Sequence, residues 1–296
     1  DEVIDKIIIT LLSGGHMLLV GLPGLAKTRL VRSLGTIMGL TRKRIQFTPD
    51  LMPTDILGTE ILDETGKGKR SFRFIEGPVF SQFLLADEIN RASPRTQSAL
   101  LQAMQEQRVT VAGKNYTLPK PFHVLATQNP IEQEGTYVLP EAQLDRFLMQ
   151  INITYPDKNS EKQMLIATTG IDEKDPKKIL SAKDLIKAQE LIRSIPVGEK
   201  VIEAILTLVR NARPDTSNLK IVKNNLSWGP GPRASQAFMN ATRARAIING
   251  RISPSIDDVI SLAEPILKHR MSLNYSAKAE GKTLNDILSE LIKTIK

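Results

Sequence analysis

The feature that most constrains this chain is a short apolar run that ends in two adjacent carboxylates, Phe83-Leu84-Leu85-Ala86-Asp87-Glu88. The run predicts a buried strand, and neither carboxylate can be buried without a partner. We therefore expect both acids at the carboxyl tip of the strand, the edge at which parallel α/β sheets bind ligands. One acid could hold a hydrated Mg²⁺ there while its neighbour orients an attacking water. Taken alone, the two acids could also form an exposed turn.

A glycine-rich segment upstream of these acids has the pattern of a phosphate-binding loop. The segment Gly21-Leu22-Pro23-Gly24-Leu25-Ala26-Lys27-Thr28 follows an apolar strand and opens a helix, which is the context of a phosphate-binding loop. Backbone N–H groups would stabilise the phosphates, Lys27 would reach the β- and γ-phosphates, and the Thr28 hydroxyl would bind Mg²⁺. Ala26 stands where the general pattern has glycine, so the acid pair is needed to predict a nucleotide triphosphatase.

Three further polar residues are candidates for the same chemistry. Asn129 ends the segment Ala126-Thr127-Gln128-Asn129-Pro130, where it could bind the attacking water or γ-phosphate, or simply form a turn. Arg146 lies just before the last predicted strand, and its alternative is a surface pair with Asp145. Arg233 lies in the first turn of a predicted helix, where a cation opposes the helix dipole and calls for an anion such as phosphate.

The first half of the chain alternates apolar strands with amphipathic helices, the pattern of a parallel α/β sheet. One predicted helix carries an apolar stripe and stops at Gly39, and another begins at Ser93 as its cap and buries Ala99, Leu100, Ala103 and Met104. The five predicted strands span residues 17–20, 45–48, 83–86, 122–126 and 150–153.

Two stretches interrupt this alternation with patterns typical of hairpins. Residues 58–76 alternate apolar and polar side chains around a Gly-containing turn. Residues 109–111 and 116–118 flank a second predicted connection, Ala112-Gly113-Lys114-Asn115. Either hairpin could be only an edge ribbon of the main sheet.

Beyond Tyr155-Pro156-Asp157 the strand signals vanish. A capping box at Ser181 and Asp184 opens one helix, and further helices are predicted at 199–212, 233–249, 255–270 and 283–295. The sequence therefore predicts an α/β domain over residues 1–155 and a smaller all-helical domain over residues 156–296.

Composition narrows the function classes. The chain has no cysteine, which excludes disulfides and thiolate chemistry and fits a cytoplasmic protein. No apolar run reaches the ~18 residues that a membrane span needs. Residues 156–296 carry 23 basic and 16 acidic side chains, whereas residues 1–155 carry 17 and 16. The basic half could meet nucleic acid, an acidic partner or nothing at all. We expect at most weak, non-specific nucleic-acid binding, because we find no basic–aromatic cluster of the kind that stacks bases.

These motifs together resemble the MoxR family of AAA+ ATPases, in which alanine is common at the position of Ala26. The likeness is nearly continuous over residues 4–157, thin between about 170 and 226, and resumes at residues 229–234 and 266–270. The segments that carry it most clearly are residues 21–28, 84–92, 97–101, 126–130, 132–137 and 139–147.

The resemblance implies a P-loop AAA+ core with a five-stranded parallel sheet and a helical lid, assembled as a ring, typically a hexamer. It implies Walker A roles for Lys27 and Thr28, a metal-binding role for Asp87 and a base role for Glu88. It also implies sensor 1 at Asn129, a finger acting on a neighbour's ATP at Arg146, and sensor 2 at Arg233. The hairpins correspond to the helix-2 insert (about 58–76) and the pre-sensor-1 hairpin (about 109–118).

The expected function is Mg²⁺-dependent hydrolysis of the β–γ phosphoanhydride of ATP. The family resemblance implies coupling to chaperone-like remodelling, activation or metal insertion of a protein client, through a partner with a von Willebrand factor A domain. One alternative is a nucleic-acid-dependent AAA+ motor. A second is a non-hydrolysing nucleotide switch, which would lack Glu88 or Arg146, and both are present.

Overall fold

The structure is a computed structural model that describes residues 2–21, 27–65, 69–130, 135–155, 157–169 and 176–295. The chain divides into two compact units, and each is described by itself. One consists of Leu19–Tyr137 and Asn152–Ile186, and the other of Asp1–Leu18, Val138–Ile151 and Lys187–Lys296. Since each unit combines separate stretches, the predicted domain boundary at residues 155 and 156 stays a prediction.

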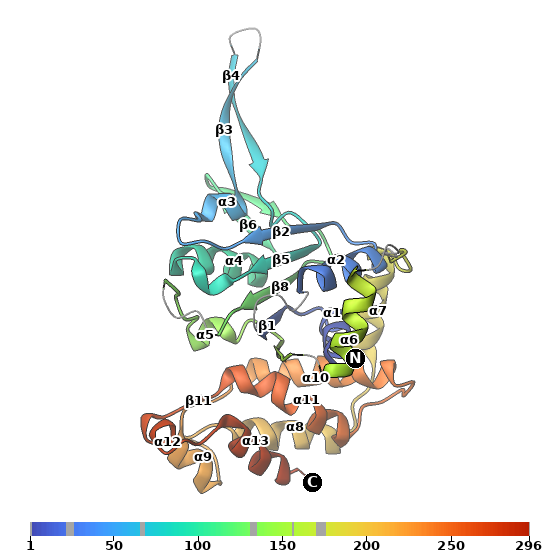
Figure 1. Ribbon diagram of the computed structural model, residues 1–296, viewed down its shortest axis with the longest axis vertical. Helices are drawn as coiled ribbons and strands as arrows, with labels where there is room; N and C mark the ends of the chain where they lie inside the picture. The colour runs from blue at the N-terminus through green and yellow to red at the C-terminus, as the bar shows by residue number, and fades with distance from the viewer. Residues whose placement is uncertain are drawn as a thin grey trace. The chain divides into compact units, whose positions relative to one another are not determined.

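A five-stranded sheet with the strand order β2-β5-β8-β1-β9 confirms the predicted α/β fold (Figure 1). Strand β5 lies next to β2 and β8 and runs parallel to both. The order matters for function, because it puts the carboxyl tip of β5 between the tips of two neighbours. The strands are β1 (Met17–Gly21), β2 (Arg42–Gln46), β5 (Phe83–Asp87), β8 (His123–Gln128) and β9 (Met149–Ile153).

Burial explains which strands the sequence predicts well. Residues 83–86 of β5 and 123–127 of β8 are all buried, so both strands appear in the sequence as almost continuous apolar runs. Strand β2 lies at the edge of the sheet and buries only Ile45. Its predicted range, residues 45–48, was therefore wrong by about half the strand, because charged residues at 42–44 gave no strand signal.

Of the helices up to residue 169, the sequence predicted two, α2 and α4, and both form largely where it indicates. In α2, Val31 and Leu34 are buried, and the chain leaves the helix through Gly39 at φ 60°. In α4, the Thr96 N–H donates to Ser93 Oγ, as predicted for a cap, but Gln97 and Leu101 are buried more fully than Ala99. The helices are α1 (Glu2–Leu12), α2 (Lys27–Ile37), α3 (Pro53–Leu57), α4 (Pro94–Glu106), α5 (Glu141–Leu144) and α6 (Lys158–Thr169).

Both predicted hairpins form, each as a separate two-stranded antiparallel sheet rather than an edge ribbon of the main one. The first, β3 (Gly58–Thr65) with β4 (Lys69–Glu76), projects from the sheet as a long ribbon (Figure 1). The second joins β6 (Arg108–Val111) to β7 (Lys114–Thr117). Its predicted four-residue connection was wrong: Ala112 and Gly113 alone turn the chain, at φ 48° and 79°, as in a type I′ turn.

The two hairpins are joined where they meet. The rings of Phe74 and Tyr116 stack with centroids 4.0 Å apart, and Phe80 packs edge-on against Phe74 at 5.5 Å. Glu60 Oε1 lies 3.3 Å from Lys114 Nζ. A displacement of the β3–β4 hairpin would therefore be transmitted to the β6–β7 hairpin, and the reverse.

The second half is mainly helical, as predicted. The predicted helices are confirmed, and the last turn of the 255–270 segment is a 3-10 helix, η2 (Lys268–Arg270). The sequence did not predict α9, α12 or the antiparallel pair β10 (Leu226–Trp228) and β11 (Ser272–Leu273), since such short elements carry little periodicity. The helices are α7 (Ala182–Ser194), α8 (Glu199–Asn211), α9 (Lys220–Asn225), α10 (Pro232–Ile248), α11 (Ile256–Leu267), α12 (Tyr275–Ala279) and α13 (Leu284–Lys293).

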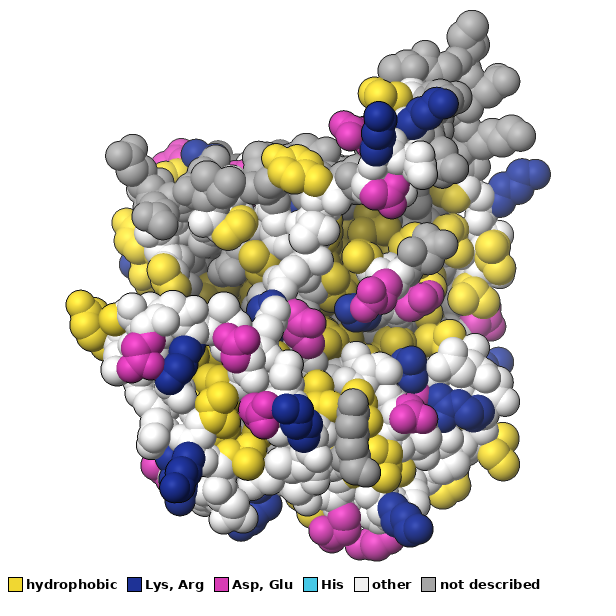
Figure 2. All heavy atoms as spheres, turned by 60° about the horizontal axis from the view of Figure 1, so that its bottom comes forward, with side chains coloured by type: hydrophobic (Ala, Val, Ile, Leu, Met, Phe, Trp, Pro, Cys, Tyr) yellow, Lys and Arg dark blue, Asp and Glu magenta, His cyan; other side chains and the backbone are white. Residues whose placement is uncertain are grey.

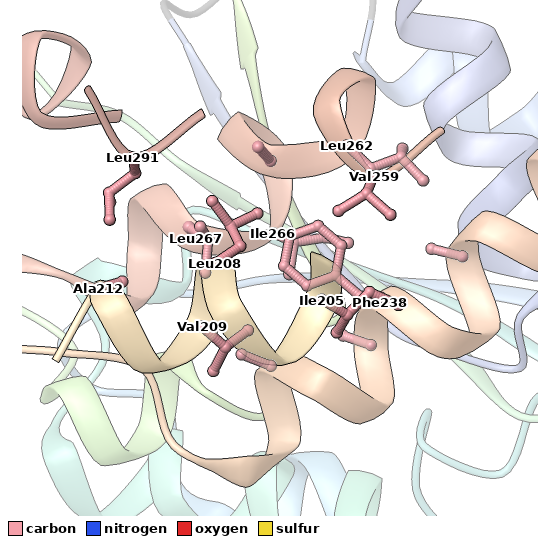
Figure 3. Packing of buried hydrophobic residues seen from close by; sticks show 14 of the residues in the cluster. Ile205, Leu208, Val209, Ala212, Phe238, Val259, Leu262, Ile266, Leu267 and Leu291 are labelled. Carbon is pink, nitrogen blue, oxygen red and sulfur yellow. The ribbon is translucent and has the colours of Figure 1, made fainter. Parts of the chain in front are cut away.

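An apolar core holds the helical unit together. Phe238 of α10 packs with Ile205 of α8 and with Val259 and Leu262 of α11 (Figure 3). At its edge, Asp258 is fully buried and pairs with Arg245 and Arg251. Burial alone would raise the pKa of Asp258, but hydrogen bonds from Arg251, Ser255 and Arg245 outweigh it and hold the pKa below its ordinary value.

Candidate functional site

One threonine hydroxyl joins the two acids at the tip of β5. Thr127 Oγ1 donates to Asp87 Oδ1 at 2.6 Å and accepts from the backbone N–H of Glu88 at 2.8 Å. Thr127 is fully buried. A hydroxyl has one proton to donate, so these two bonds fix its orientation. The same oxygen atom of the neighbouring strand β8 thus binds the carboxylate of Asp87 and the backbone of Glu88.

Glu88 has an uncommon backbone conformation for a residue with a side chain. Its φ of 56° and ψ of 51° lie in the left-handed region. Such a conformation costs on the order of 1–3 kcal/mol and persists only where the surroundings enforce it. Here the Glu88 N–H is bound by Thr127, and its carbonyl accepts from the Arg91 N–H at 2.9 Å. The chain therefore turns sharply at Glu88, from β5 into the 3-10 helix η1 (Ile89–Arg91).

Polar side chains of strand β2 bind both carboxylates. Arg44 Nη2 lies 2.8 Å from Asp87 Oδ2, and Gln46 Nε2 donates to Glu88 Oε2 at 2.7 Å. Arg44 also donates to Gln46 Oε1 at 2.7 Å, so the two β2 side chains are linked. From η1, Arg91 Nη1 lies 3.0 Å from Glu88 Oε2. Each acid thus has a basic partner, and these half-exposed arginines balance its charge.

Lys27 begins helix α2, and its ammonium group donates to the carbonyl of Gly21 at 2.6 Å. Burial lowers the pKa of Lys27, while the negative charges of Asp87 and Glu88 act in the opposite direction. The ammonium is therefore near enough to feel both acids. A Cβ at Gly21 would lie 2.6 Å from the carbonyl of Ile153, so only glycine fits there.

The remaining loop residues predicted to bind phosphate, Leu22, Pro23, Gly24, Leu25 and Ala26, lie outside the described residues. Thr28 is exposed in the first turn of α2. Asn129 follows β8 and is buried, and its carbonyl accepts from Asn90 Nδ2 at 3.4 Å. The structure thus brings together Asp87 and Glu88, whose negative charges act on Lys27, and it places Asn129 just past the end of β8.

The two arginine candidates lie in the other unit. Arg233 is in the first turn of α10, and its Nη1 lies 3.9 Å from Asp145 Oδ2. Arg146 follows Asp145 after the short helix α5. Asp145 does not serve as the surface partner of Arg146. Its carboxylate instead binds Arg270 Nε at 2.7 Å, and Arg270 is almost fully buried.

Sequence reasoning missed several residues that shape these groups, namely Thr127, Arg44, Gln46, Arg91 and Arg270. Thr127, Arg91 and Arg270 lie within segments that carry the family resemblance, so a signal existed for them. Arg44 and Gln46 alternate along an edge strand, and only the pairing of β2 with β5 shows that they face the acids.

The chemistry of the donors suits Mg²⁺. Asp87 offers a carboxylate and Thr28 a hydroxyl, and Mg²⁺ typically takes one or two such protein oxygens and completes its shell with water and phosphate. A dedicated cage would need more, and among the residues that the structure describes no group of three His, Cys, Asp or Glu side chains could hold a metal. Within the same residues, we find no helix with the length and apolar character to cross a membrane.

Comparison with known proteins agrees with this geometry. Residues 16–149 match the ATPase family associated with various cellular activities (AAA), and residues 218–291 match the AAA lid domain. Chaperone MoxR1 of Mycobacterium tuberculosis is 41% identical over 100% of this chain and 78% of its own length. The uncharacterised protein YeaC of Bacillus subtilis is 40% identical over 97% of this chain and 86% of its own.

A solved structure supports the same assignment. The crystal structure of a provisionally assigned ATPase from Cytophaga hutchinsonii superposes with a TM-score of 0.90 and 42% identity, covering 98% of this chain and 88% of that one. Its similarity extends over both the sheet and the helical part. Matched in sequence over its whole length and in fold, this chain belongs to the MoxR family of AAA+ ATPases.

Proposed function

We propose that this chain hydrolyses the β–γ phosphoanhydride of ATP with Mg²⁺ and uses the energy to remodel or activate a protein client. The observation that carries the proposal is the shared hydroxyl of Thr127, which binds the Asp87 carboxylate and the Glu88 backbone N–H at the end of a parallel strand. Two adjacent acids at the end of a parallel strand, whose negative charges reach the Lys27 ammonium, suit a metal ligand and a general base.

The roles divide according to position. Asp87, with Thr28, would hold Mg²⁺, which supplies charge neutralisation on the phosphates. Glu88 would orient the attacking water and accept its proton. Lys27 and the backbone of residues 21–28 would bind the β- and γ-phosphates. Gln46 and Arg91 both bind the Glu88 carboxylate, so they set where the base lies before a water reaches it.

The first prediction separates these roles. We expect Lys27→Ala to lower ATP affinity, because the phosphates lose their cation. We expect Glu88→Gln to bind ATP normally and to lose turnover, since an amide cannot accept the proton of the water. Nucleotide binding and steady-state hydrolysis should be measured on both variants. Hydrolysis near the wild-type rate by Glu88→Gln, together with its loss in Asp87→Asn, would show that the two acids are assigned the wrong way round.

We further propose that the active form is a ring, with hexamers as the expected size, in which each ATP is completed by a neighbouring subunit. In this assembly Arg146 would act as the finger on the neighbour's ATP, while Asn129 and Arg233 would contact the nucleotide of their own subunit. The support is the family membership together with the position of Arg233 at the N-terminus of α10, where an arginine gains from a bound anion.

The second prediction tests this trans action. Arg146→Ala should abolish hydrolysis and spare nucleotide binding, because an arginine finger contributes about 10³–10⁵ in kcat. Mixing Arg146→Ala with Lys27→Ala should restore part of the activity, since some junctions then combine an intact loop with an intact finger. Subunit exchange should be verified with labelled protein. If the rings exchange subunits but stay inactive at every mixing ratio of the two variants, the finger acts within its own subunit.

The client and partner are proposed from the family. The Mycobacterium tuberculosis relative is named a chaperone, which supports chaperone-like remodelling; metal insertion into a client and a partner with a von Willebrand factor A domain follow the same resemblance. The joined hairpins support a mechanical role, because Phe74 and Tyr116 couple an exposed ribbon to a second hairpin. On β3–β4, Leu62 and Phe72 face each other across the strands and are both exposed.

One observation favours the alternative of a nucleic-acid-dependent motor. Strand β4 alternates basic and aromatic side chains, Arg70, Phe72, Arg73 and Phe74, contrary to the expectation that the chain has no such cluster. Two observations oppose it. Strand β3 contributes Glu60 and Asp63, and Arg73 pairs with Asp63 at 3.2 Å. On the face drawn in Figure 2, Lys and Arg side chains lie interspersed with Asp and Glu.

The third prediction decides between remodelling of a protein client and a nucleic-acid-dependent motor. Titrating single- and double-stranded DNA into the ATPase assay should leave kcat unchanged at 50 and at 200 mM salt, with binding no tighter than about 10⁻⁴–10⁻⁶ M. A true nucleic-acid face would lose affinity steeply across this salt range. A severalfold rise in kcat that disappears both on adding salt and in Phe72→Ala would establish the motor function instead.

A further inference from the structure

A buried guanidinium binds the chain on both sides of Arg146. Arg270 ends η2 and is only 2% exposed. Its Nε donates to Asp145 Oδ1 at 2.7 Å, and its Nη2 donates to the carbonyls of Phe147 at 2.7 Å and Asp145 at 3.3 Å. Its Nη1 donates to the carbonyl of Leu148 at 3.2 Å. Four of its acceptors therefore lie in the four-residue segment that contains Arg146.

The residue before Arg270 acts on the same segment. His269 is also buried, and its Nε2 lies 3.0 Å from the Phe147 carbonyl. Burial and the charge of Arg270 lower the pKa of His269 well below its ordinary value, so the ring is neutral near pH 7. The dipeptide that closes η2 thus fixes the backbone just before and just after Arg146, and it leaves the Arg146 side chain itself partly exposed.

The chemistry of this contact indicates that it sets geometry. Removing a charge from water is costly, and apolar side chains of similar volume often stabilise a protein as well as a buried ion pair does. An arginine presents five N–H donors in a rigid plane, and here they are directed at fixed carbonyls. Asp145 Oδ2 also lies 3.9 Å from Arg233, so the same carboxylate neighbours the second candidate arginine.

We propose that Arg270 is a positioning residue for the arginine finger: by binding Asp145 and the carbonyls around Arg146, it holds that side chain where a neighbouring subunit's ATP can meet it. The proposal rests on the proposed trans action of Arg146. A misplacement of about 1 Å can cost on the order of 10²-fold in rate, so the loss of this clamp should appear in kcat rather than in nucleotide affinity.

The experiment uses two variants and a matched control, each made in the whole 296-residue chain. Arg270→Lys keeps the positive charge but replaces the planar fork by a point charge with three donors. Asp145→Asn removes the charge of the strongest acceptor at a partly exposed position, so it also serves if Arg270→Lys fails to fold. The control is Asp258→Asn, which makes the same change at an acid that also pairs with two arginines but lies away from Arg146.

Each protein is assayed for affinity toward a fluorescent ATP analogue, for kcat, and in mixed rings. We expect Arg270→Lys to lose about 10- to 100-fold in kcat at unchanged affinity, and Asp145→Asn to lose less. Mixing either variant with Lys27→Ala should restore hydrolysis, whereas mixing it with Arg146→Ala should not. Asp258→Asn should lower the melting temperature and show neither the selective loss in kcat nor this pattern of rescue.

Two results would overturn the inference. The first is a wild-type kcat in the folded Arg270 and Asp145 variants. The second is a loss that Lys27→Ala subunits do not rescue, or that Asp258→Asn reproduces, since either would make the clamp a stabilising contact only. Failure of the proposed function is distinguishable, because Arg146→Ala would then hydrolyse ATP at the wild-type rate. If Arg146→Ala behaves as a finger variant and Arg270→Lys does not share its rescue pattern, the positioning role alone is wrong.

Discussion

The candidate site depends on how two adjacent carboxylates are accommodated at the end of a buried strand. Asp87 and Glu88 cannot both lie at the tip of β5 without partners, and the chain meets this demand from the two flanking strands. Strand β8 provides the hydroxyl of Thr127, and β2 provides Arg44 and Gln46. The strand order β2-β5-β8 is therefore a condition for the proposed chemistry and not only a feature of the fold.

The helical unit also contains a buried charged side chain whose hydrogen bonds are satisfied by distant residues. A charged group is withdrawn from water, and the groups that satisfy it belong to a segment with a proposed role in hydrolysis. Arg270 binds Asp145 and the carbonyls that surround Arg146. Asp258 shows the contrast, since its arginine partners come from α10 and the turn that follows it, and the ion pair ties helices together. In the proposed scheme, the first of these buried groups places a side chain and the second joins two stretches of chain.

The sequence predicts best those features that follow from local pattern. Strands β5 and β8 are buried on both faces and appear as apolar runs, and the cap at Ser93 and the stop at Gly39 follow from single residues. Strand β2 was misplaced because an edge strand buries one side chain. The turn at Ala112 and Gly113 was predicted to be too long, because Lys114 and Asn115 are also common in loops.

The acids and the lysine could be identified from motifs, whereas their partners could not. Arg44 lies 43 residues from Asp87, and Arg270 lies 125 residues from Asp145, so each contact exists only once distant elements have packed. Nothing in the local sequence distinguishes Arg44 from its neighbours Arg42 and Lys43. The register of β2 against β5, with Gln46 opposite Asp87, is what selects the residues that face the acids.

The most direct test of this account is the steady-state ATPase rate of Thr127→Val beside that of Thr127→Ser, with nucleotide affinity measured on both. Valine keeps the volume and removes the hydroxyl that joins Asp87 to Glu88, whereas serine keeps the hydroxyl. If the shared hydroxyl sets the hydrolytic geometry, the valine variant will bind ATP and lose turnover, and the serine variant will retain most of it. Wild-type hydrolysis by Thr127→Val, or equal losses in both variants, would contradict the account.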